Sequence, residues 1–88
     1  MSRTRELTVM SRQWCHLCHD LVGQLQPLAD ELGWTVRILD VDADPMLEAR
    51  WDELVPVVLA GSTELCRYHL DEAVIRAYCG RFPLESAV

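Results

Sequence analysis

The sequence predicts an α/β domain in which helices flank a mixed four-stranded sheet, with the element order β-α-β-α-β-β-α. The chain has 88 residues, of which 50% are apolar and 25% charged, a composition typical of an ordinary globular domain. Short runs rich in β-branched residues alternate with segments of helical periodicity, and the last two runs are close enough to form a hairpin. We therefore expect residues 1–88 to form a single domain.

The first half of the chain predicts a strand, a helix and a second strand. Residues 6–9 alternate between polar and apolar, as a strand with one buried face does. Residues 35–41 are rich in β-branched side chains and predict the second strand. Between them, apolar residues at three- and four-residue spacing predict an amphipathic helix that ends at Gly33. These residues are Cys18, Leu21, Val22, Leu25, Leu28 and Leu32. Such a unit implies a right-handed crossover between parallel strands.

The second half of the chain predicts a short helix followed by a hairpin. Asp44 and Pro45 form a favourable helix start, because an acceptor stands at the N-cap and proline at the first helical position. The expected buried side of this helix comprises Met46, Leu47 and Trp51. Residues 57–59 and 64–68 predict two strands joined by a turn over residues 60–63.

The last predicted element is a helix that Asp71 caps and Gly80 ends. Its expected buried face comprises Val74, Ile75 and Tyr78. The hairpin before it adds an antiparallel pair to the parallel pair of the first half, so the sheet is expected to be mixed.

Charge and hydropathy exclude several classes of function. The 8 basic and 14 acidic residues give a net charge of −6, which argues against a nucleic-acid partner. No apolar run approaches the roughly 20 residues of a membrane span, and the first residues lack the apolar core of a secretory signal. We therefore expect a cytoplasmic protein that does not enter a membrane, and we expect it to be a monomer.

The residues that could carry out chemistry begin at Trp14, where the first strand leads into the first helix. A cysteine at a helix N-terminus faces unpaired backbone N–H groups and the positive end of the helix dipole, and both stabilise a thiolate. Cys15 is therefore the expected nucleophile. Cys18 lies one turn further and is the expected resolving thiol, because it can close a disulfide with Cys15. Trp14 is expected to shield the thiolate or to contact the substrate.

Val55 and Pro56 form the second feature. A proline that opens a strand has no N–H for the sheet, which suits an edge or a loop that faces a ligand. A cis peptide bond there presents the Val55 backbone to an incoming chain, whereas the alternative is an ordinary trans proline.

Two other interpretations use the same cysteines. Cys15 to His19 also matches the pattern of c-type haem attachment, which requires export. Cys66 and His69 provide a second Cys-x-x-His half for zinc, but a long stretch separates them from the first pair. We expect Cys66 and Cys79 to be packing residues, because free cysteines are usually buried.

With these features together, the sequence resembles the glutaredoxin branch of the thioredoxin superfamily, and more closely its small bacterial members with a Cys-x-x-Cys motif. The resemblance spans about Leu7 to Tyr78. It rests on Cys15-His16-Leu17-Cys18, Asp40-Val41-Asp42-Ala43-Asp44-Pro45, Val55-Pro56-Val57-Val58 and Leu70-Asp71.

The resemblance implies a thioredoxin fold, a dithiol–disulfide site and a cis peptide bond between Val55 and Pro56 in the substrate loop. It also implies that Arg12 pairs with a carboxylate of glutathione and that Asp71 lies near the amine of glutathione. Glutathione is then a co-substrate, and no other cofactor and no metal are expected.

The chain departs from the glutaredoxin pattern before the last helix, where Arg67 and Tyr68 replace a Gly-Gly turn. We therefore expect weak glutathione binding. The predicted function is thiol–disulfide oxidoreduction on a disulfide-bearing protein or a small thiol. The alternative is a non-enzymatic zinc-binding module that uses the same cysteines.

Overall fold

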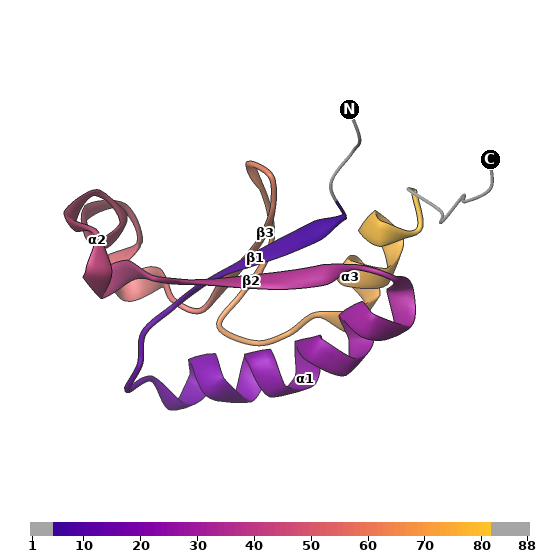
Figure 1. Cartoon of the computed structure of the whole chain (residues 1–88), viewed down its shortest axis with the longest axis horizontal. Coiled ribbons are helices and arrows are strands. Elements are labelled where there is room, and N and C mark those ends of the chain that lie inside the picture. Colours follow the sequence, from indigo (N-terminus) through magenta and orange to yellow (C-terminus); the bar gives the residue numbers. More distant parts are fainter. Residues whose placement is uncertain (1–4, 82–88) are drawn as a thin grey trace.

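The computed structural model describes residues 5–81, and its element order confirms the predicted one (Figure 1). The strands are β1 (Glu6–Ser11), β2 (Thr35–Asp40), β3 (Val57–Ala60) and β4 (Thr63–Arg67). The α-helices are α1 (His16–Leu32), α2 (Pro45–Trp51) and α3 (Glu72–Cys79). Two short 3-10 helices, η1 (Val41–Ala43) and η2 (Asp52–Leu54), flank α2.

The four strands form one mixed sheet in the order β2-β1-β3-β4. β1 and β2 are parallel, as the crossover through α1 requires, and Leu7 lies opposite Val36. β3 runs antiparallel to both β1 and β4. This order puts β2 and β4 at opposite edges, so the chain that leaves β1 toward α1 starts from the middle of the sheet.

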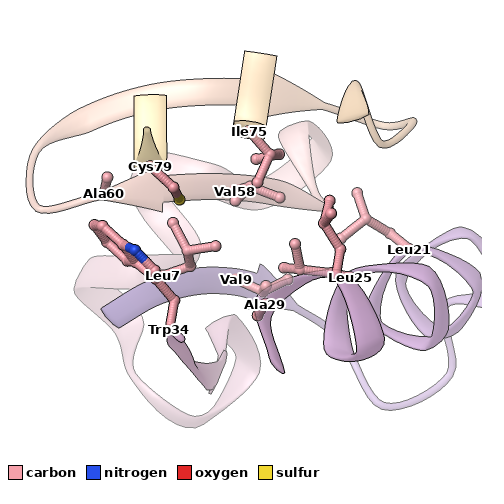
Figure 2. Close-up of a cluster of buried hydrophobic side chains, with 11 residues drawn as sticks. Leu7, Val9, Leu21, Leu25, Ala29, Trp34, Val58, Ala60, Ile75 and Cys79 are labelled. Atoms are coloured by element: carbon pink, nitrogen blue, oxygen red, sulfur yellow. The ribbon is translucent and has the colours of Figure 1, made fainter. Parts of the chain in front are cut away.

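The core lies on both faces of the sheet, because alternate residues of a strand point to opposite sides. The first core cluster packs α1 and α3 against one face, and Figure 2 shows side chains of both helices meeting Leu7, Val9 and Val58. The second core cluster lies on the other face around α2 and includes Met10, Cys18, Val41, Trp51, Val55, Val57 and Leu59. Trp51 is buried, as expected for the short helix, and Trp34 is buried in the first core cluster.

Several predicted boundaries shift by one or two residues. β1 continues to Ser11 because Met10 and Ser11 still pair with β2. Thr63 pairs with Ala60, so the hairpin turn is shorter than predicted. Gly61 in this turn has a φ of 62°, a conformation that glycine adopts without steric cost.

Two side chains assigned to buried helix faces are exposed. Met46 in α2 is 80% exposed, and Val74 in α3 is also exposed, while Ile75 and Cys79 provide the buried side of α3. Both helices are short, so the spacing of apolar residues leaves the rotation of the helix open. Among residues 5–81, no helix is long and apolar enough to cross a membrane.

Candidate functional site

Cys15 and Cys18 lie at the start of α1 and form a disulfide. Cys15 is the N-cap residue, and its Sγ accepts a hydrogen bond from the backbone N–H of Cys18 at 3.1 Å. Their Cα atoms are 5.2 Å apart, which is within the range for a disulfide. Cys18 is fully buried and Cys15 is half-buried, so a reagent from solvent reaches Cys15 first.

Backbone hydrogen bonds fix Cys15 at the N-terminal, positive end of the α1 dipole. Its backbone N–H donates to the carbonyl of Arg12 at 3.3 Å, and its own carbonyl accepts from the N–H of His19 at 3.1 Å. The first turn of α1 contains no acidic residue that would oppose a negative charge on sulfur. The geometry therefore favours the thiolate form of Cys15 when the disulfide is reduced.

The peptide bond between Val55 and Pro56 is cis, which confirms the expectation for this loop. Val55 and Cys18 belong to the second core cluster, and Cys15 packs against that cluster. The carbonyl of Pro56 accepts a hydrogen bond from the N–H of Tyr68 at 2.7 Å. The loop before β3 is thus brought to the dithiol and tied to the segment after β4.

Tyr68 is a feature of the site that the motif did not identify as functional. Its φ of 70° lies in the left-handed region, which costs a side-chain-bearing residue about 1–2 kcal/mol. Its hydroxyl donates to the carbonyl of Glu53 at 3.3 Å, so the ring reaches back to the segment before Pro56. A small cavity of about 190 Å³ lies between Tyr68, Leu70 and the first turns of α1. The sequence signal for a role of Tyr68 is the bulky pair Arg67-Tyr68 at a turn where glutaredoxins carry two glycines.

Arg12 lies in the loop before the dithiol and is surrounded by carboxylates. Its guanidinium lies 3.0 Å from Asp42, 2.8 Å from Asp52 and 3.9 Å from Glu48. The hydrogen bond to Asp52 contributes most to raising the pKa of Arg12. These bonds join the loop after β1 to η1 and to the end of α2. A glutathione carboxylate at Arg12 therefore has to compete with contacts that the chain itself supplies.

Trp14 is 75% exposed beside Cys15 in the sequence. The Arg12 Cζ lies 5.6 Å from the centroid of its ring, within the range of a cation–π contact. The ring is therefore held at the surface by a residue that is itself anchored. Its contact with a substrate stays a prediction.

Asp71 caps α3, as predicted. Its carboxylate accepts from the N–H of Val74 at 3.2 Å, and its carbonyl accepts from the N–H of Ile75 at 3.1 Å. The side chain is exposed. Its proposed contact with the amine of glutathione stays a prediction.

The other two cysteines are free thiols in a different setting. Cys79 is buried in the first core cluster, and Cys66 is half-buried against it. Burial raises the pKa of both thiols. For Cys66, this effect is larger than that of a hydrogen bond with the backbone of Asp71, which lowers the pKa. These thiols therefore stay protonated, and hence poorly reactive, at neutral pH.

A zinc site requires several ligands in one place. Within residues 5–81, no group of three or more His, Cys, Asp or Glu side chains is arranged to hold a metal ion. Cys66 and His69 in particular form no such group with the dithiol. The described part of the chain gives the zinc-binding alternative no ligand set.

Comparison with known proteins agrees with this geometry. The family model described as Glutaredoxin-like domain (DUF836) matches residues 6–79. An uncharacterized protein of Mycobacterium tuberculosis is 33% identical over 86 residues, which cover 92% of this chain and 88% of that protein.

Solved structures with the same fold include the NMR structure of protein Ne2328 from Nitrosomonas europaea. It has a TM-score of 0.75 and 32% identity, and the match covers 89% of this chain and 94% of that one. Thioredoxin 1 of Thermosipho africanus has a TM-score of 0.62 and 19% identity over 86% of this chain and 96% of its own. The second likeness shows the fold alone, which is the thioredoxin fold.

Proposed function

Because the chain belongs to the glutaredoxin-like domain family, we propose that it is a thiol–disulfide oxidoreductase in which Cys15 is the nucleophile and Cys18 the resolving thiol. The observation that carries the proposal is the position of Cys15 as the N-cap of α1, with the N–H of Cys18 directed at its sulfur. The fully buried Cys18 lies within disulfide distance behind it. An accessible thiol and a protected partner are what a two-step exchange requires.

The reaction proceeds through a mixed disulfide. The Cys15 thiolate attacks one sulfur of the substrate disulfide, the S–S bond breaks, and the departing substrate thiolate takes up a proton. Cys18 then loses its proton and attacks the Cys15 sulfur, which releases the second substrate thiol. The substrate gains two electrons, and the Cys15–Cys18 disulfide carries the equivalent oxidation. An external thiol reductant has to restore the dithiol for the next turnover.

The surroundings favour a disulfide-bearing protein or peptide over glutathione as the main partner. Arg12 already forms hydrogen bonds with Asp42 and Asp52. Tyr68 takes the position where a smaller residue would leave room for glutathione beside the dithiol. Trp14, in contrast, offers an exposed aromatic surface next to Cys15.

Turnover measured in parallel with two electron donors tests the proposal. One reaction contains glutathione and glutathione reductase, and the other contains NADPH and thioredoxin reductase, with the same peptide disulfide in both. We expect the protein reduced beforehand with a dithiol to reduce the peptide stoichiometrically, and the glutathione-coupled rate to be low. A pre-reduced protein that leaves every disulfide intact would contradict the proposal. Fast glutathione-coupled turnover would contradict only the preference for the partner.

A further inference from the structure

A second cavity lies beside the dithiol, between α1 and β2, on the side of β1 away from β3 and β4. Its volume is about 500 Å³, and we call it the α1–β2 cavity. Arg12 and His19, which line it, flank the dithiol in the chain, and the N–H of His19 donates to the carbonyl of Cys15. Neither cysteine lines the cavity, so it neighbours the proposed active site through the loop after β1 and the first turns of α1, and it is separate from the loop that contains Pro56.

The body of this cavity is apolar. Val22 and Gly23 of α1 line one wall, and Ile38 of β2 lines the other. Ile38 is 48% exposed on an edge strand, although a branched apolar side chain is usually covered. A Cβ atom built on Gly23 meets nothing within 4 Å, so the cavity is open along the helix.

The end of the cavity near the dithiol carries negative charge. Asp40 lines it, and its Oδ1 is fixed by the N–H of Asp42 at 2.9 Å. Arg12 also lines it, but three carboxylates lie within 4 Å of that one guanidinium. The charge at this end therefore favours a cation over an anion.

We infer that the α1–β2 cavity receives an arginine or lysine side chain of the substrate, a few residues away in sequence from the disulfide that Cys15 attacks. The substrate backbone then passes over the apolar body of the cavity, the aliphatic stem lies along Val22, Gly23 and Ile38, and the charged head turns back toward Asp40 at the end near the dithiol. Long cationic side chains often bury their stems on apolar surface while the head stays at a polar group. This inference rests on the proposed function and names its substrate class.

Matched peptide disulfides test this inference. Each pair carries arginine or norleucine at one position flanking the cysteine, and the position is varied along the peptide. Norleucine keeps the apolar stem and lacks the charge. We expect one position at which the arginine peptide has a kcat/KM about two- to fivefold above its norleucine partner, the size expected for a partly exposed ion pair.

Two variants locate the effect, and a third controls for it. Asp40→Asn keeps an acceptor for the Asp42 N–H but removes the charge, so the arginine preference should disappear. Gly23→Leu fills the open space on a helix that tolerates leucine better than glycine, so neither side chain should enter the cavity and the ratio of the two rates should fall to about one. Ala77→Leu adds the same side chain at an exposed position of α3 and should keep the preference of the native protein.

The readout is a ratio within each variant, so a general loss of activity does not imitate the effect. Equal rates for arginine and norleucine at every position would overturn the inference and leave the proposed function standing. A preference that survives Asp40→Asn would also overturn it. If the native protein reduces no peptide at all, the proposed function fails and this inference fails with it.

Discussion

Two cysteines lie at the start of α1 and two lie in or against the first core cluster, and the same chemical group has different surroundings in the two places. At the start of α1, the backbone N–H of Cys18 is directed at the Cys15 sulfur, and the buried Cys18 completes a disulfide with Cys15. In and against the first core cluster, Cys66 and Cys79 are separate free thiols whose pKa values burial raises. Figure 2 shows Cys79 reaching from α3 toward the β3 side chains of that cluster.

The difference lies in the surroundings that the fold gives each thiol. Residues 15 and 18 share a helix start, where the dipole and free N–H groups favour negative charge. Cys79 near the end of α3 meets neither of these conditions, because its surroundings are apolar side chains.

The largest expected effect is from Cys15→Ser. Serine keeps the N-cap acceptor for the Cys18 N–H, so the helix start should persist, but its hydroxyl cannot carry out the exchange. We expect peptide disulfide reduction to fall to the uncatalysed rate. Cys66→Ser is the matched control because it removes another thiol, and it should retain nearly full activity. Retained activity in Cys15→Ser would show that the nucleophile is a different cysteine.

Cys18→Ser should change the product of the reaction, from a released thiol to a trapped mixed disulfide. In Cys18→Ser, attack by Cys15 should proceed, but no thiol remains next to Cys15 to release the substrate. We expect a stable adduct between Cys15 and one half of the peptide disulfide, detected as a mass increase of the intact protein. An unmodified protein after incubation would show that Cys15 does not attack unaided.

Much of the fold follows from local patterns in the sequence, whereas parts of the site depend on contacts between distant segments. The strand and helix order, the cap at Asp71 and the two motif cysteines are all local signals, and the structure has each of them in place. Arg12 instead meets Asp42 and Asp52, which lie 30 and 40 residues away along the chain. Nothing near Arg12 in the sequence reveals that its charge is already paired.

Which side chains of the short helices are exposed could not be predicted from the sequence either. The apolar residues of α2 and α3 are compatible with more than one rotation of each helix, and packing on the sheet selects one. Met46 and Val74 consequently face solvent. The sequence also does not predict the left-handed backbone of Tyr68, because a tyrosine rarely adopts this conformation. The hydrogen bond from its N–H to the carbonyl of Pro56 supports the conformation in the folded chain.

A third prediction asks what limits access to the reactive pair. Tyr68→Gly removes the ring next to the Pro56 loop and relieves the left-handed backbone, while the N–H to the Pro56 carbonyl remains. We expect glutathione-coupled turnover to rise several-fold, measured against Tyr78→Phe as a control for general effects of altering a tyrosine. An unchanged rate would mean that Tyr68 does not restrict glutathione.

The smallest expected effect concerns stability at alkaline pH. A thiol whose pKa rises on folding contributes stability below its unfolded pKa of about 8.5, and this stability is lost as the pH rises through the folded pKa. With the Cys15–Cys18 disulfide kept oxidised, the free energy of unfolding should therefore fall above pH 8.5, by at most about 1.4 kcal/mol per pH unit for each such thiol.

Urea titrations near pH 7 and above pH 9 measure this slope. Cys79→Ala should be less stable at neutral pH because it loses a buried side chain, but its stability should fall less on going to alkaline pH. The same slope in both proteins would show that Cys79 does not resist ionisation in the folded chain.

The rate of alkylation at each cysteine of the reduced native protein, measured as a function of pH, tests most directly whether the helix start makes Cys15 the reactive thiol. Iodoacetamide is added for short times, and peptide mass spectrometry reports the labelled fraction at Cys15, Cys18, Cys66 and Cys79. We expect Cys15 to be labelled first at mildly acidic to neutral pH, and its rate of alkylation to rise with a midpoint below the free thiol value of about 8.5. Labelling of Cys66 or Cys79 before Cys15 would contradict the claim that the helix start makes this thiol the reactive one.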